Sequence, residues 1–260
     1  MDLGMPTLIG CKTTEECAAL CHDLKLQFVE LNMNLPQYQP GRTDAAQLRA
    51  LAQRYGIYYT IHLDENLNPG DFNPYVAEAW RRTALEAIQL AEAIGAPVLN
   101  MHLARGVYFT LPAEKVFLFQ KYKQPYLQAM EAFRDACTPA AQKSGVCISI
   151  ENSSGYTDFQ MEALDLLLQS PAFGLTFDIG HNHAIGSADE PAILARKARL
   201  GHFHMHDAAG QRDHLALGDG EIDLPAYFTL AGQCNARAVV EVKTPEALQK
   251  SVAWLRTQNS

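Results

Sequence analysis

Apolar residues along this chain gather in short runs that alternate with longer segments of helical periodicity. Eight runs have the length of buried strands, and the run at residues 57–62 is rich in aromatic and β-branched residues. They cover residues 7–10, 27–31, 57–62, 98–102, 146–151, 173–178, 200–204 and 238–242. Strands that are apolar on both faces are typical of a parallel sheet covered by helices.

Segments with helical periodicity separate these strands. Helices are expected at residues 13–25, 43–55, 73–93, 113–143, 158–169, 190–197, 224–232 and 244–256. Thr13 and Glu16 have the spacing of a capping box, and Gly56 is expected to end the second helix as a C-cap. Pro125 is expected to interrupt the long fourth segment, because proline breaks or kinks a helix.

Eight strands, each followed by a helix, are the count of a (β/α)8 TIM barrel, and 260 residues suit one such domain. No linker, composition shift or internal repeat divides the chain, so a single domain over residues 1–260 is expected. The main structural alternative is an open doubly wound sheet. That fold is expected to carry a glycine-rich turn after its first strand, and GCKTTEE at residues 10–16 is not one.

The composition is that of a globular protein with a full core, 48% hydrophobic and 19% charged. A net charge of -8 disfavours a surface built on non-specific phosphate contacts, so nucleic acid is not an expected partner. No apolar run is long enough to span a bilayer, and the first residues do not resemble a signal peptide. The six cysteines form no CxxC pair, which favours reduced thiols and a cytoplasmic protein. The sequence does not indicate an oligomeric state.

Metal-binding side chains occur at the carboxyl ends of six successive strands. In a TIM barrel these ends form one rim, where active sites lie. The strand-end residues are His62, His102, Glu151, Asp178, His204 and Glu241, and His181 and His214 follow in nearby loops. One such residue alone is usually an ordinary polar group, but clustered carboxylates repel one another unless a cation binds between them. Carboxylate oxygen with imidazole nitrogen suits zinc, manganese, iron or cobalt better than calcium.

Five short motifs lie at or after these strand ends. They are IEN at 150–152, FDIGH at 177–181, HMHD at 204–207, HLALGDGEID at 214–223 and VEVKT at 240–244. In this order they make the chain resemble the xylose isomerase-like TIM barrels. That superfamily includes sugar phosphate isomerases and epimerases and endonuclease IV (AP endonuclease family 2). The resemblance implies a divalent metal bound by Glu151, Asp178, His204 and Glu241, with His181 contacting the substrate or a second metal.

A metal-dependent isomerase or epimerase is the activity that we rank first. Glu151 and Glu241 would bind the metal and act as the acid/base pair on either side of the carbon next to a carbonyl. The substrate would be a small sugar or sugar phosphate. Its contacts would come from His181, Asn152, Arg105 and Lys243.

The alternative activity is that of an endonuclease IV-like zinc phosphodiesterase with two or three ions, acting on abasic-site DNA. Its additional zinc ligands would match His62, His102, His181 and His214. Endonuclease IV has an aspartate two residues before the last of these, where this chain has Arg212. Asp213 is one position out of place, which is expected to turn its side chain elsewhere. We therefore expect one or two ions and not three, and a metal-binding barrel without catalysis is the remaining alternative.

Overall fold

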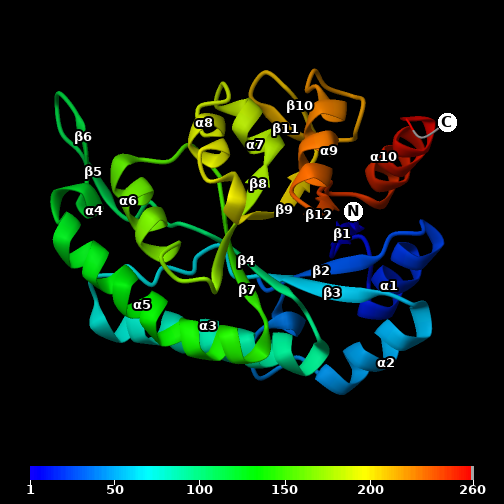
Figure 1. The fold of residues 1–260 in the computed structure, drawn as a ribbon, viewed down its shortest axis with the longest axis horizontal. Helices are drawn as coiled ribbons and strands as arrows, with labels where there is room; N and C mark the ends of the chain where they lie inside the picture. Colours follow the sequence, from blue (N-terminus) through cyan, green and yellow to red (C-terminus); the bar gives the residue numbers. More distant parts are fainter. Residues whose placement is uncertain (259–260) are drawn as a thin grey trace.

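The structure, a computed structural model that describes residues 1–258, is built on a closed barrel of eight parallel strands (Figure 1). The barrel strands are β1 (Leu3–Pro6), β2 (Phe28–Asn32), β3 (Tyr58–His62), β4 (Val98–His102), β7 (Cys147–Glu151), β8 (Phe173–Asp178), β9 (Leu200–Met205) and β12 (Arg237–Val240). Each strand pairs in parallel with the next in this order, and β12 closes the barrel on β1. The TIM barrel expected from the sequence is confirmed.

Helices cover the outside of the barrel and connect its strands (Figure 1). They are α1 (Thr14–Asp23), α2 (Ala45–Tyr55), α3 (Pro74–Ile94), α4 (Leu118–Lys121), α5 (Lys123–Ser144), α6 (Asp158–Leu167), α7 (Ile179–Ala184), α8 (Glu190–Leu194), α9 (Leu224–Gln233) and α10 (Pro245–Gln258), with 3-10 turns at Pro36–Tyr38 and Lys197–Arg199. Thr13 caps α1 by accepting from the Glu16 amide, although the Glu16 carboxylate accepts from Lys12 instead of completing a capping box. Gly56 ends α2 in the left-handed conformation, as expected.

The first strand lies earlier than the sequence predicted. It runs over Leu3–Pro6, whereas the apolar run at residues 7–10 is a loop in which Ile9 is 85% exposed. Glycine and proline in the observed strand weaken its sequence signal. Tertiary packing explains the glycine, because a side chain at Gly4 would overlap the Phe28 ring on β2. Tight packing requires glycine at this position, and glycine has a low strand propensity, so the sequence pattern does not predict a strand here.

Two hairpins and one helix were not predicted. The expected helix from residue 113 instead begins as a hairpin of β5 (Tyr108–Thr110) and β6 (Lys115–Phe117), which extends away from the barrel (Figure 1). The helical segment then breaks at Tyr122, and Pro125 lies in the first turn of α5, where its missing N–H leaves no bond unmade. A second hairpin, β10 (Asp207–Ala209) with β11 (Arg212–Leu215), replaces the expected loop after β9, and α7 follows β8 directly.

The inside of the barrel is unusually polar. Branched apolar side chains are the usual filling of this fold. Here the buried residues of the barrel strands include Glu30, Thr60, Asn100, Ser149, Glu151, Thr176, Asp178, His202 and His204. Buried charges are costly unless they are paired, so the barrel must balance them internally. Within residues 1–258, no helix has the length and apolar character needed to cross a membrane.

Candidate active site

Four side chains converge where β7, β8, β9 and β12 end. Glu151, Asp178, His204 and Glu241 each offer an atom to a group within 4.8 Å of one another. The Nδ1 atom of His204 is central, 3.2 Å from an oxygen of Glu151, 3.0 Å from one of Glu241 and 3.8 Å from one of Asp178. The parallel register pairs Asp178 with His204 and so brings these strand ends to the same level. These are the four residues that the resemblance implied as metal ligands.

Imidazoles balance the buried carboxylates of this group. Burial opposes the charge of Glu151, but His204 and then His102 outweigh it and hold the pKa of Glu151 well below its usual range. Burial likewise opposes the charge of Glu241, and His204 again lowers its pKa well below the ordinary value. Burial disfavours a charged His204, yet Glu151 and Glu30 raise its pKa well above that of a free histidine. A divalent cation would supply the same positive charge, because metal binding displaces protons from its ligands.

Several buried atoms around this group have no hydrogen-bond partner within residues 1–258. They are Glu241 Oε2, His102 Nε2, His181 Nδ1, His204 Nε2 and His214 Nε2. Each lies within ion-pair distance of an oppositely charged group but outside hydrogen-bond geometry. Buried polar atoms are nearly always hydrogen-bonded, so five such atoms around one centre are consistent with a ligand position. Carboxylate oxygens with imidazole nitrogens are the donor set of zinc and similar divalent metals. The residues present therefore fit a metal ion.

His62 and His102 lie on the other side of Glu151. Their Nε2 atoms are 3.3 Å and 3.2 Å from the same carboxylate oxygen, Glu151 Oε2, and their rings are 5.0 Å apart. The second oxygen, Oε1, is the one near His204. Asn100 also donates a hydrogen bond to Oε2. Glu151 thus lies between His204 on one side and the pair of His62 and His102 on the other, and this pair could hold a second ion together with Glu151.

A third group contains His181, His206 and His214, whose ring nitrogens also lie within 4.8 Å of one another. Asp213 joins them, with one oxygen 2.9 Å from His214 Nδ1 and the other 4.0 Å from His181 Nε2. The expectation that Asp213 turns away was therefore wrong. The strand backbone is left-handed at His214 (φ 53), which breaks the alternation of side chains and brings both residues to the site, while Arg212 stays exposed.

Two of the residues expected at the substrate have other contacts. The Asn152 side chain is fully buried and bonds both the backbone N–H and the carbonyl oxygen of Asp178. The Arg105 guanidinium donates to the carbonyl oxygens of Ser154 and Gly155. These contacts fix the end of β8 and the loop after β7. Neither side chain lines the cavity over the carboxylates.

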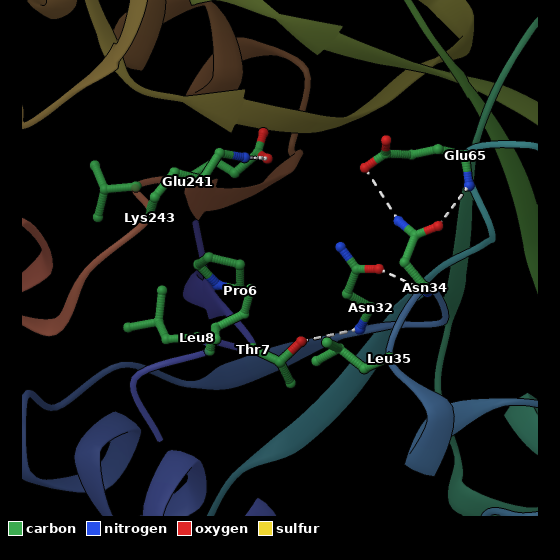
Figure 2. A pocket seen from close by; sticks show the side chains of 11 residues that line it. Pro6, Thr7, Leu8, Asn32, Asn34, Leu35, Glu65, Glu241 and Lys243 are labelled. Carbon is green, nitrogen blue, oxygen red and sulfur yellow. Dashed lines mark hydrogen bonds and ion pairs between the residues drawn. The ribbon is translucent and has the colours of Figure 1, made fainter. Parts of the chain in front are cut away.

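That cavity has a volume of about 320 Å³. It is lined by Asn32, His62, Glu65, His102, Glu151, Ser153, His181, His214, Glu241 and Lys243. A second cavity of about 360 Å³ shares Asn32, Glu65, Glu241 and Lys243 with it and continues over apolar residues of β1 and the following loop. Figure 2 shows Glu241 and Lys243 on one side of this second cavity, facing Asn34 and Glu65 on the other. Lys243 Nζ lies 2.9 Å from a Glu241 oxygen, so the main cation at this mouth is already paired.

Asp207 organises the loop after the seventh barrel strand. Its Oδ1 atom accepts from the amides of Ala208 and Ile222, and Oδ2 accepts from Gly218 and Gly220. Loops after the last two strands of a TIM barrel often bind phosphate through such amides. In this chain the four backbone amides of the loop already donate to the carboxylate of Asp207.

The sequence reading missed Glu30, which lies buried on β2 beside His202 and His204. Its signal was present in the strand QFVEL, because a glutamate within an apolar strand must have a buried partner. The partner could not be named, since it comes from a strand about 170 residues away in sequence. His206 was also seen in the HMHD motif but not assigned to the site, and it contacts Asp178 at 2.9 Å.

The fold and the cluster at its rim define a TIM barrel with a buried divalent-metal donor set. The chain matches the family of xylose isomerase-like TIM barrels over residues 18–258 and belongs to it.

Two relatives are proteins of Methanocaldococcus jannaschii. Uncharacterized protein MJ1311 is 26% identical over 186 residues, which cover 68% of this chain and 60% of that protein. Uncharacterized protein MJ1188 is 21% identical over 88% of this chain and 83% of its own length.

Solved structures share the same fold over the whole chain. A D-tagatose 3-epimerase-like protein superposes with a TM-score of 0.78 at 19% identity, covering 100% of this chain and 97% of its own. The 3-keto-D-glucoside 4-epimerase YcjR from E. coli gives 0.79 at 16% identity, covering 99% of both chains. The IOLI protein with a binding zinc atom gives 0.74 at 15% identity, covering 100% and 96%. At these identities the likeness establishes the fold.

Proposed function

We propose that this protein is a divalent-metal-dependent sugar isomerase or epimerase that removes a proton next to a carbonyl. The observation that carries the proposal is the placement of Glu151 and Glu241 around one metal-type centre. Their oxygens lie 3.2 Å and 3.0 Å from the same His204 nitrogen, and both residues line one cavity of sugar size. The similar folds of a D-tagatose 3-epimerase-like protein and of a 3-keto-D-glucoside 4-epimerase support this class.

In the proposed mechanism Glu151, Asp178, His204 and Glu241 would hold the ion, and a bound divalent ion would polarise the substrate carbonyl. One glutamate takes the proton from the carbon next to the carbonyl. The other glutamate, which enters the step as the carboxylic acid, gives its proton to the opposite face, and this inverts that carbon in an epimerase.

The sugar hydroxyls would meet the histidines that line the cavity. His62, His102 and His181 each expose part of a ring there and can donate or accept a hydrogen bond. If a second ion binds, His62, His102 and Glu151 would hold it. Asn152 and Arg105 then have an indirect role, because they position Asp178 and the loop after β7.

We propose further that the sugar is not phosphorylated. The cavity walls carry the carboxylates of Glu65, Glu151 and Glu241, which repel an anion. Lys243 is paired with Glu241, and the amides that a phosphate would use are bonded to Asp207. Phosphate sites need free cationic or amide donors.

The test is turnover of unphosphorylated ketoses in deuterated water with added Mn²⁺. Deuterium should enter the carbon next to the carbonyl, and Glu151→Gln and Glu241→Gln should each lower the rate by about 10²–10⁴-fold. His204→Ala should lose bound metal as well as activity. Glu162→Gln, which removes an exposed carboxylate paired with Lys123 on the helical layer, is the matched control and should keep both. Product formation without deuterium uptake contradicts the proton-abstraction mechanism, and full metal content in His204→Ala contradicts the metal centre.

A zinc phosphodiesterase is the second candidate, and the grouping of Asp213 with His181 and His214 favours it. Together with His62 and His102 on Glu151, this grouping gives donor sets for up to three ions. Clustered ions can stabilise the attacking and leaving oxygens of a phosphodiester. The acidic loop at residues 62–73 and the net charge of -8 argue against DNA as substrate. Three zinc ions per chain with cleavage of abasic-site DNA would favour this function, whereas one or two ions without cleavage favour the isomerase.

A further inference from the structure

Glu30 lies in the middle of β2 inside the barrel, with only 2% of its surface exposed. Its Oε2 atom accepts a hydrogen bond of 2.8 Å from the hydroxyl of Thr60 on β3 and lies 2.9 Å from His202 Nε2 on β9. The other oxygen, Oε1, lies 2.8 Å from His204 Nε2. One carboxylate on β2 therefore contacts both its neighbour β3 and β9, which lies beyond β1 and β12 in the barrel.

The contact with His204 is the informative one. His204 Nδ1 faces Glu151 and Glu241, and its second nitrogen, Nε2, faces Glu30. An imidazole can bind a metal through Nδ1 only if its proton is on Nε2. A carboxylate beside Nε2 favours the tautomer that carries its proton on that nitrogen. Here the two atoms lie 2.8 Å apart, although the Nε2–H group and the Glu30 oxygen do not reach full hydrogen-bond geometry.

A purely structural role explains these contacts less well. An apolar residue would fill the barrel interior without the cost of burying a carboxylate, which is several kcal/mol unless it is repaid by pairing. Glu30, His202 and His204 also lie close enough together to hold an ion of their own. An ion at that position would bind the lone pair on His204 Nε2. His204 could then not also bind an ion in the four-residue centre through Nδ1, because that would require a lone pair on both ring nitrogens. Neutral imidazole has only one.

We infer that Glu30 is a positioning residue of the metal centre, an inference that rests on the proposed metal-dependent function. It holds His204 in the Nε2–H tautomer, with the Nδ1 lone pair directed at the position shared by Glu151 and Glu241. Thr60 and His202 hold the Glu30 carboxylate in place from the other side. Glu30 itself does not line the cavity or touch the substrate.

Mn²⁺ titration of Glu30→Gln tests this role without any substrate. The variant keeps the shape of the side chain but can turn an NH2 group toward His204, so its affinity for Mn²⁺ should fall by about 10–100-fold. Ser149→Ala is the matched control. It removes another buried hydrogen bond inside the barrel, between Ser149 and Thr176, and should change the affinity by less than about twofold. Equal affinity in Glu30→Gln and the wild type overturns the inference.

The imidazole ¹⁵N spectrum of histidine-labelled protein gives a readout that a merely structural role would not move. With Zn²⁺ bound, wild-type His204 should show a proton on Nε2 and none on Nδ1, and Glu30→Gln should show a mixture of tautomers. A wild-type spectrum without the Nε2 proton overturns the inference even if the variant does not fold. Wild-type protein that binds neither ion overturns the proposed function and this inference together, whereas unchanged binding in Glu30→Gln overturns this inference alone.

Discussion

Replacing Asp207 by asparagine should destabilise the loop that follows β9. Each carboxylate oxygen of Asp207 accepts two backbone amides, from Ala208 and Ile222 on one side and from Gly218 and Gly220 on the other. Asparagine keeps one oxygen and turns an NH2 group toward the remaining pair of N–H groups. Two charge-assisted hydrogen bonds are therefore lost. The two backbone N–H groups that made them then face the NH2 group of asparagine, which is also a donor.

The magnitude follows from the number of bonds. A hydrogen bond to a charged group contributes about 1.5–3 kcal/mol, so losing two costs about 3–6 kcal/mol of unfolding free energy. For a chain of this length that corresponds to a fall in Tm on the order of 10 °C. The loop has little freedom to relax, because even a Cβ at Gly220 would overlap Asp207 and the Ala208 carbonyl.

Thermal and urea unfolding of Asp207→Asn would measure this cost. Asp219→Asn is the control in the same loop. Among the residues that the structure describes, the Asp219 side chain forms only an exposed pair with Lys250, so the change should alter stability by less than about 1 kcal/mol. A Tm for Asp207→Asn within about 1 °C of the control would refute the assignment of Asp207 as the anchor of the loop. It would also remove one of the arguments for an unphosphorylated substrate.

Two further predictions concern packing and thiol chemistry. Gly180→Ala should destabilise the protein by about 1–3 kcal/mol and weaken Mn²⁺ binding, since its Cβ would overlap the buried His206 ring. Gly232→Ala, with open space at its Cβ inside α9, should be neutral or stabilising in the same melts, and equal effects of the two would be inconsistent with this packing. Three thiols are buried in the core, those of Cys17, Cys21 and Cys137. Burial raises the pKa of each to about 12, so iodoacetamide at about pH 8 should label none of them in the native protein and all of them in urea; rapid native labelling would contradict their burial.

The sequence predicted the barrel because its strands and helices alternate with clear periods. It failed at β1, where Gly4 is required by the Phe28 ring and not by strand propensity. It also failed at β5 and β6, where a helical pattern continued into residues that form an exposed hairpin. In both places the observed structure depends on contacts with distant residues or with solvent, which local pattern does not record.

The sequence by itself determined which residues reach the rim. Glu151 and Asp178 end parallel strands and His204 is the last residue but one of another, and the ends of parallel strands in a closed barrel must meet on one side. Only the tertiary structure decided which atoms face one another. The contact of Glu30 with His204 joins positions far apart in the chain, and that of Asp213 with His181 depends on a left-handed residue in a hairpin. Such contacts are set by barrel closure, strand register and local backbone conformation, and these physical variables are fixed only when the whole chain packs.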